Sequence, residues 1–247
     1  MTSDVSLSFG DKTFPGFYAC PDGAGKFPGV IVIHEVWGLN DHTKDVANRL
    51  KDEGYCVLAP DLISHTGVHE KIDNNLLKEA QDPATRDEAQ KKLRAAMAPI
   101  QSKEFGEETV AKLKICFDFL MAQSNCDGNI AVMGFCFGGT YSFALAAAEK
   151  DLKAAAVFYG HAPDPLDKVQ TIHCPVMGFY GEQDANLVNG LPDLDKAMKQ
   201  YGINFEYKVY PNTGHAFFND TNPARYNKEA EEDSWQKVLA FFAKNLV

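Results

Sequence analysis

Polar and apolar residues alternate near the start of the chain, and uninterrupted apolar runs follow. The alternating segments 5–9 and 13–19 flank a Gly-Asp turn, which predicts an antiparallel hairpin at a sheet edge. The apolar runs 29–34 and 55–59 predict buried strands, and the segment between them has apolar residues at helical spacing. A strand, a helix and a second strand in succession predict a right-handed parallel crossover.

The same order of elements continues to the end of the chain. Further strands are predicted at 130–134, 154–160, 175–181 and 205–210. Helices are predicted at 41–53, 105–122, 141–148, 192–201 and 226–245. This regular alternation predicts an α/β fold in one domain over residues 1–247, with a mostly parallel, doubly wound sheet and an N-terminal antiparallel hairpin.

Residues 63–103 interrupt the alternation. They are polar, contain two prolines and carry weak helical patterns such as 82–97. In open α/β folds, ligands bind at the carboxyl ends of the strands. We therefore interpret this segment as a small, cap-like excursion over that edge of the sheet.

Composition narrows the class of protein. At 247 residues the chain is long enough to bury a substantial core, and its 45% hydrophobic residues are ordinary for a globular protein. The formal net charge of -10 argues against nucleic acid or an anionic membrane as a partner. We predict a cytoplasmic protein, because no apolar segment is long enough to span a membrane and residues 1–4 lack the features of a signal peptide.

The six cysteines show no C-x-x-C pair and no metal-finger spacing, so no metal site is predicted. In a reducing compartment, five of them are expected to be inert. The sixth is Cys136, which stands between a predicted strand and a predicted helix. The six are Cys20, Cys56, Cys116, Cys126, Cys136 and Cys174.

Residues 134–139 read Gly-Phe-Cys-Phe-Gly-Gly, which has the spacing of the G-x-S-x-G nucleophile elbow with cysteine in place of serine. Such a turn needs glycine, because its backbone is strained and an added Cβ would meet the adjacent strand and helix. It would hold the Cys136 thiol above the positive end of the next helix, which favours a thiolate. An isolated motif of this kind is more often a buried, inert cysteine, so the hypothesis requires an acid and a base elsewhere.

Asp184 and His215 supply that acid and base, since each follows a later predicted strand. The chain order of nucleophile, acid and base is the one found in α/β-hydrolases. His215 would take the proton of Cys136 or pair with its thiolate, and Asp184 would fix the histidine tautomer. Glu182 could serve as the acid instead, and Asp184 could merely cap a turn.

Three residues near the elbow complete the candidate site. The backbone N–H groups of Phe137 and Val36 are expected to stabilise an oxyanion. Glu35 follows a wholly apolar strand, and near Cys136 it would accept the thiol proton or disfavour the thiolate, so it could gate reactivity. It could equally be a carboxylate that reaches solvent at a strand end. His34, at the end of the same strand, could simply satisfy backbone groups.

Four motifs in this order resemble the dienelactone hydrolase family, also called carboxymethylenebutenolidases. They lie at residues 33–40, 134–139, 181–184 and 214–217. The resemblance implies an α/β-hydrolase fold with a minimal cap and hydrolysis of an enol lactone to maleylacetate. It also implies site residues: the triad Cys136, Asp184 and His215, the oxyanion donors Val36 and Phe137, and Glu35 as a gate that takes the thiol proton when substrate binds.

The chain departs from this family in the cationic residues that would bind the substrate. Lactone-cleaving members hold the substrate carboxylate with arginines, one of them shortly after the catalytic histidine, whereas residues 216–220 contain no cation here. Arg86 lies in the region of the other arginine, although it could be an ordinary exposed helical residue. Further candidates for contacting substrate are Trp37, Tyr159, His161 and Phe217.

We therefore predict a cofactor-free, cysteine-dependent hydrolase that acts on small lactones or activated esters as a monomer or weak homodimer. One alternative is a carboxylesterase or thioesterase with another acyl group. A second is a thiol-based redox sensor, for which Cys174 or Cys56 would have to approach Cys136. An arginine within reach of the Cys136 sulfur would favour a lactone that carries a carboxylate.

Overall fold

The computed structural model describes residues 1–72, 74–79, 82 and 85–247. Its centre is an eight-stranded sheet with the order β1-β2-β4-β3-β5-β6-β7-β8. The strands are β1 (Thr2–Phe9), β2 (Lys12–Ala19), β3 (Phe27–Ile33), β4 (Cys56–Pro60), β5 (Cys126–Phe135), β6 (Ala154–Phe158), β7 (Val176–Gly181) and β8 (Phe205–Tyr210). Strands β3 to β8 are parallel, and the β1–β2 hairpin joins them antiparallel through β4. The predicted α/β fold and N-terminal hairpin are confirmed.

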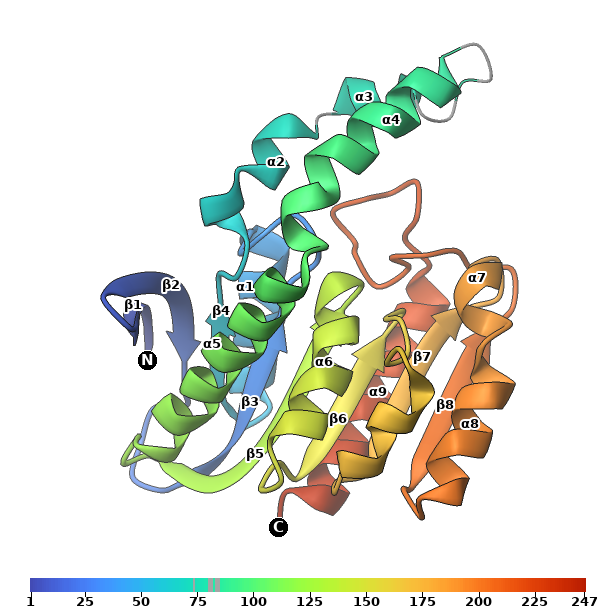
Figure 1. Ribbon diagram of the computed structural model, residues 1–247. Helices are drawn as coiled ribbons and strands as arrows, with labels where there is room; N and C mark the ends of the chain where they lie inside the picture. The colour runs from blue at the N-terminus through green and yellow to red at the C-terminus, as the bar shows by residue number, and fades with distance from the viewer. Residues whose placement is uncertain (73, 80–81, 83–84) are drawn as a thin grey trace.

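Helices cover both faces of the sheet (Figure 1). One face carries α5 (Lys103–Met121), α6 (Phe137–Ala148) and α8 (Leu191–Gln200), and the other carries α1 (Asp41–Asp52) and α9 (Lys228–Asn245). Short helical turns η3 (Leu166–Thr171) and α7 (Ala185–Val188) follow β6 and β7. No helix in the described ranges is long and apolar enough to cross a membrane.

Because both faces are covered, the central strands are almost wholly buried. Residues 30–33 of β3 have no exposed surface, nor do residues 130–133 of β5. This explains why they appear in the sequence as continuous apolar runs rather than alternating ones. Ile33 pairs with Gly134, and Phe135 pairs with Phe158. The strands therefore end level with one another, and the residues that follow them meet at one edge.

The segment after β4 forms short helices that rise beyond the carboxyl ends of the strands (Figure 1). They are η1 (Ser64–Thr66), α2 (Val68–Lys71), α3 (Asn74–Glu79), α4 (Arg86–Met97) and η2 (Ala98–Ile100). The helical pattern predicted at 82–97 corresponds to α4, although residues 83 and 84 lie outside the described part of the chain. These helices belong to the segment that the sequence predicts as a cap-like excursion, and their role as a cap stays a prediction.

Some element boundaries differ from the predicted ones for local reasons. The strand predicted at 154–160 ends at Phe158, because Tyr159 has φ 38°, a backbone conformation incompatible with a strand. The last helix begins at Lys228 rather than at 226. Asn227 caps it, since its side-chain oxygen accepts a hydrogen bond from the N–H of Ala230.

Candidate active site

Cys136 lies between β5 and α6 in a strained turn, with φ 53° and ψ −110°. Its neighbours leave no room for side chains. A Cβ on Gly134 would lie 2.1 Å from the carbonyl oxygen of Gly138, and one on Gly138 would lie 2.2 Å from that of Ile33. The glycines at these positions are thus required by backbone approach, as the elbow motif predicts.

Backbone hydrogen bonds fasten the turn to the strands on either side. The N–H of Cys136 donates to the carbonyl of Phe158 at 3.0 Å, and the N–H of Gly138 donates to that of His34 at 3.1 Å. The half-buried Cys136 side chain therefore stands at a fixed point between the ends of β3 and β6.

His215 and Asp184 are brought together from two later loops. Asp184 follows β7 and His215 follows β8, and Nδ1 of His215 hydrogen-bonds Oδ2 of Asp184. The carboxylate of Glu182 is engaged elsewhere, because it accepts a hydrogen bond from the N–H of Asn212 at 2.9 Å. Of the two acids that the sequence left open, Asp184 is the one that holds the histidine.

The surroundings of His215 favour its charged form. Burial alone would lower its pKa, but the hydrogen bond to Asp184 and the interaction with the Cys136 side chain outweigh burial and raise the pKa to about 10. His215 is therefore an imidazolium at neutral pH. A cation in this position is suited to stabilise a thiolate on Cys136 and to donate a proton.

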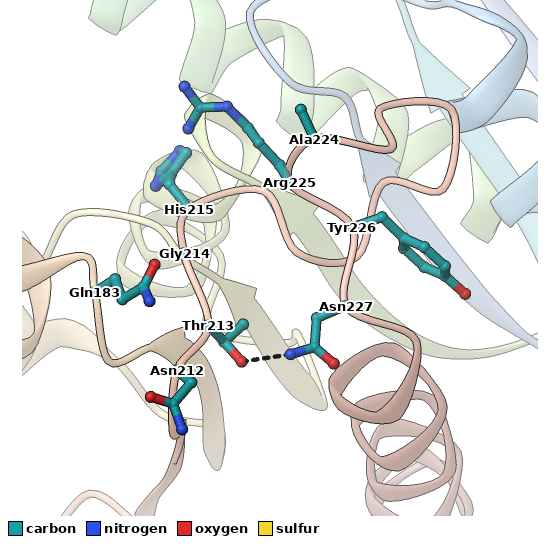
Figure 2. Close-up of a pocket in the computed structure, with 9 residues that line it drawn as sticks. All are labelled: Gln183, Asn212, Thr213, Gly214, His215, Ala224, Arg225, Tyr226 and Asn227. Atoms are coloured by element: carbon teal, nitrogen blue, oxygen red, sulfur yellow. Dashed lines mark hydrogen bonds between the residues drawn. The ribbon is translucent and has the colours of Figure 1, made fainter.

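The loop that carries His215, residues 211–227, is tied down at both ends; we refer to it as the His215 loop. At its base, Nδ2 of Asn227 donates to Oγ1 of Thr213 at 2.8 Å, as Figure 2 shows. Further along, Phe218 is fully buried and faces the guanidinium of Arg49, which also lies 4.2 Å from the Trp235 ring. Arg49 of α1 and Trp235 of α9 thus pack near Phe218, a residue of the His215 loop.

Glu35 lies two residues beyond β3 and is buried, with 5% of its surface exposed. Its Oε2 accepts a 2.8 Å hydrogen bond from Nδ2 of Asn219, whereas its Oε1 and the buried hydroxyl of Tyr159 have no partner of good hydrogen-bond geometry among the described residues. Glu35 and Tyr159 nevertheless interact, because burial, followed by the Glu35 and Cys136 charges and a contact with the Glu35 side chain, raises the pKa of Tyr159 well above its ordinary value. Of the two interpretations of Glu35, the structure agrees with a carboxylate inside the site rather than one in solvent.

Two backbone donors near Cys136 remain free. In the described part of the chain, the N–H groups of Val36 and Phe137 donate no hydrogen bond to any backbone or side-chain acceptor. Phe137 is the first residue of α6, where an N–H has no acceptor within its own helix. Both are thus available to a ligand oxygen, and their role as oxyanion donors stays a prediction.

A cavity of about 420 Å³ opens beside His215 (Figure 2). It is lined by Gln183 and by residues of the His215 loop, among them Arg225. Figure 2 shows the Arg225 guanidinium on the same side of the loop as the His215 ring. Arg225 is exposed and forms no ion pair with any described residue. Sequence reasoning missed it, because it follows the histidine by ten positions and only the folded loop brings it back.

The other candidate substrate contacts are more dispersed. Trp37 is half-buried next to Val36, and Tyr159 lies beneath His215 with ring centroids 5.0 Å apart. His161 is exposed and lines a separate groove along α6, and Arg86 is exposed in the first turn of α4. Phe217 has no exposed surface and packs on Tyr159 and other rings, so it belongs to the core beneath the cavity.

The remaining cysteines lie far from Cys136. Cys20 and Cys56 form a disulfide, which corrects the expectation that all five cysteines outside the elbow are inert thiols. Cys56 opens β4 and is level with Ile130 in the sheet, which places it roughly 20 Å from Cys136 along the strand direction. Cys174 is buried before the first residue of β7. Neither approaches Cys136, so the redox-sensor alternative lacks a resolving thiol. Within the described ranges, no three His, Cys, Asp or Glu side chains gather as a metal-binding group.

The parallel sheet, the elbow after β5 and the acid and histidine after β7 and β8 define an α/β-hydrolase fold. Comparison with known proteins makes this more specific. The model of the dienelactone hydrolase family matches residues 14–246, and the chain therefore belongs to this family. It is a hydrolase of the carboxymethylenebutenolidase type, a class that acts on ester bonds.

Individual relatives agree with this assignment. A Saccharolobus solfataricus protein named "Putative carboxymethylenebutenolidase" is 38% identical over 232 residues, which cover 87% of this chain and 88% of the relative. The crystal structure of "Putative Dienelactone Hydrolase" from Klebsiella pneumoniae is 29% identical, with a TM-score of 0.79 over 98% of each chain. Pyrococcus horikoshii acylaminoacyl peptidase shares the fold alone, at 13% identity and a TM-score of 0.70 over 100% of this chain and 42% of the peptidase.

Proposed function

We propose that this chain is a cysteine-dependent hydrolase of small lactones or activated esters. Cys136 is the nucleophile, His215 the general acid and base, and Asp184 the residue that orients His215. The observation that carries the proposal is the strained elbow at Cys136 together with the hydrogen bond between His215 and Asp184. An inert structural cysteine would need neither.

In the first step, the Cys136 thiolate attacks the acyl carbon. The N–H groups of Val36 and Phe137 stabilise the resulting oxyanion. This assignment is supported by the absence of any other acceptor for either N–H among the described residues. When the tetrahedral intermediate collapses, the C–O bond breaks and the leaving alkoxide takes a proton from the His215 imidazolium. A thioester on Cys136 remains, and with a lactone the leaving alcohol stays attached to the acyl group.

In the second step, neutral His215 removes a proton from a water molecule. The hydroxide equivalent attacks the thioester carbon, and the thiolate leaves as the carboxylic acid forms. His215 again carries a proton and Cys136 again carries the negative charge, so the enzyme returns to its starting state. Asp184 stabilises the imidazolium at both ends of the cycle.

Glu35 has a regulatory place in this scheme. Glu35 is 5% exposed, and both Glu35 and Cys136 act on the buried Tyr159; like charges in a buried site disfavour each other. We propose that a proton shared between Glu35 and Cys136 keeps the thiol protonated until substrate displaces the carboxylate. The burial of Glu35 and its interaction with Tyr159, which also responds to Cys136, support this role.

Arg225 favours a substrate that carries a carboxylate. The family's arginine shortly after the catalytic histidine is absent here, but the Arg225 guanidinium lines the same cavity as His215. A guanidinium can bind a carboxylate through two parallel hydrogen bonds. We propose an anionic lactone or ester as the substrate, and a neutral acyl ester is the alternative.

One comparison tests the proposal. The kcat/KM of the wild type and of Cys136→Ala is measured on a dienelactone and on p-nitrophenyl acetate. Turnover of the dienelactone that falls by about 10³-fold or more in Cys136→Ala is expected. Turnover of p-nitrophenyl acetate alone would support the neutral-ester alternative, and turnover that survives in Cys136→Ala would remove Cys136 from the mechanism. Circular dichroism of the variant serves as the folding control.

A further inference from the structure

His34 is a wholly buried histidine at the carboxyl end of β3 that has no place in the reaction as described so far. Both of its ring nitrogens are engaged. The N–H of Leu62 donates to Nε2 at 3.0 Å, and Nδ1 hydrogen-bonds the carbonyl oxygen of Glu35. Since the Leu62 N–H can only donate, Nε2 must be unprotonated, and Nδ1 therefore carries the hydrogen and donates it.

The ring stays in this state because of its surroundings. Burial lowers the pKa of His34, so the imidazole is neutral at physiological pH. The neutral ring with hydrogen on Nδ1 then donates to the Glu35 carbonyl at all times. The N–H of Gly38 donates to the same carbonyl at 3.3 Å, so two donors hold this oxygen.

Fixing that oxygen fixes the peptide group between Glu35 and Val36. A trans peptide is planar, and its N–H points to the side opposite its carbonyl. With the carbonyl turned toward His34, the Val36 N–H is turned away from the ring. It is one of the two free donors near Cys136, and only the orientation of this peptide keeps it available.

His34 also contacts Phe137, whose N–H is the second free donor. Its ring stacks on that of Phe137, with centroids 5.6 Å apart and planes 4° apart, and its carbonyl accepts the N–H of Gly138 at 3.1 Å. One residue thus touches both peptide segments that present unpaired N–H groups. Through Leu62 it also connects them to the loop after β4.

We propose that His34 is the positioning residue of the oxyanion hole: its Nδ1–H holds the Glu35–Val36 peptide so that the Val36 N–H faces the reacting carbonyl. The inference rests on the proposed function, since it concerns the same oxyanion. It assigns His34 no contact with substrate and no proton transfer. The two hydrogen bonds of His34 have different purposes. The one to the Glu35 carbonyl orients the Val36 N–H, and the one from the Leu62 N–H holds the imidazole ring in place.

Two variants separate these purposes. The amide nitrogen of Asn reaches the position of Nδ1, so His34→Asn can keep the donor to Glu35 and loses the acceptor for Leu62. The amide oxygen of Gln reaches the position of Nε2, so His34→Gln can keep the acceptor and loses the donor. His34→Asn leaves the buried Leu62 N–H unpaired, whereas in His34→Gln the Glu35 carbonyl keeps the N–H of Gly38, so His34→Asn is expected to cost more stability and the melting temperature of each variant is measured.

Three measurements are compared: kcat and KM on the substrate that the wild type turns over, the inhibition constant of a small trifluoromethyl ketone, and the rate of alkylation by iodoacetamide. The ketone forms a tetrahedral adduct with the thiol and needs the oxyanion hole, whereas alkylation needs only the thiolate. We expect His34→Gln to lower kcat by about tenfold to a hundredfold, since removal of a whole oxyanion donor costs about 10² to 10³. In His34→Gln the affinity for the ketone should fall in parallel with kcat, whereas KM and the alkylation rate should be nearly unchanged. His34→Asn should retain most of the wild-type kcat.

Equal losses in both variants, or losses that follow the melting temperature, would overturn the proposal. If neither variant folds, the ¹⁵N shifts of His34 in the wild type decide, because the proposal requires the neutral tautomer with hydrogen on Nδ1 between pH 5.5 and 8. The other tautomer, or a ring that titrates in this range, would contradict it. Cys136→Ala in the same assays separates a failure of this inference from a failure of the proposed function. Activity that does not depend on Cys136 would contradict the proposed function, whatever the His34 variants do.

Discussion

Asn219 donates a 2.8 Å hydrogen bond from its Nδ2 to Oε2 of Glu35, and the two residues are 184 positions apart. The bond joins the His215 loop to the end of β3. It holds one oxygen of the buried carboxylate. The position of Glu35 thus depends on the same loop that carries His215.

Replacing this amide by a second carboxylate should destabilise the protein in a pH-dependent way. In Asn219→Asp, two carboxylates would meet at hydrogen-bond distance in a buried site, so the pKa of the pair is raised above that in the unfolded chain. The penalty is therefore small at pH 5 and grows as the pH rises through the raised pKa. We expect a loss of about 2–4 kcal/mol in the free energy of unfolding at pH 8, measured by urea denaturation.

Asn219→Ala is the control for this prediction. It removes the donor without adding a charge and should cost about 1–3 kcal/mol, as expected when a buried acceptor is left unpaired. A loss in Asn219→Asp that is the same at pH 5 and pH 8 would show that Glu35 is not the group that it faces.

Removing the charge of Glu35 should expose the thiolate of Cys136. Glu35→Gln keeps the shape of the side chain and the hydrogen-bonding atom that faces Asn219, but has no charge and no affinity for the thiol proton. A change of one pKa unit at a thiol changes the thiolate fraction about tenfold. We expect alkylation by iodoacetamide without substrate to become about tenfold faster. An unchanged rate would mean that Glu35 does not gate Cys136.

The pKa of His215, about 10, should appear in the pH dependence of stability. This value lies above the ordinary 6.5, so the stabilising contribution is complete below about pH 6.5 and is lost as the pH rises through about 10. The wild type should therefore exceed His215→Asn in free energy of unfolding at pH 6, and the difference should shrink at pH 10. Urea denaturation at both pH values checks this.

The same pKa predicts the basic limb of the rate profile. Because the leaving group takes its proton from the imidazolium, kcat/KM, which reports the pKa values of the free enzyme, should hold its plateau until the pH approaches about 10. A decline near pH 7 would show that His215 titrates at its ordinary value. In that case Asp184 and Cys136 would not stabilise its charge.

Arg225 should select for an anionic substrate. Arg225→Ala is expected to raise KM for a carboxylate-bearing lactone by about tenfold. This is the change in affinity expected when one charge-assisted hydrogen bond is lost. KM for p-nitrophenyl acetate, which has no carboxylate, should change less than twofold. Arg86→Ala is the matched control, since Arg86 is another exposed arginine, in the first turn of α4. If Arg86→Ala raises KM and Arg225→Ala does not, the anion is held by α4.

The sequence by itself determined the elements and the class of site. Continuous apolar runs mark β3 and β5 because both faces of the sheet are covered, and this signal is contained within each segment. The glycines around Cys136 are equally local, since the backbone approach that requires them occurs between neighbouring elements. The motif order then placed nucleophile, acid and base at one edge, because parallel strands end together.

Only the tertiary structure decided which partners meet there. Asp184 rather than Glu182 holds His215, although the two are separated by one residue and differ little in pattern. Asn219 hydrogen-bonds Glu35, and Arg225 lines the same cavity as His215. In each pair the two residues are separated in the sequence, and the folding of the His215 loop brings them together. Periodicity reports which face of an element is buried, whereas hydrogen-bond partners depend on where separate elements pack. That packing is set by the whole core and has no signature in any single stretch of sequence.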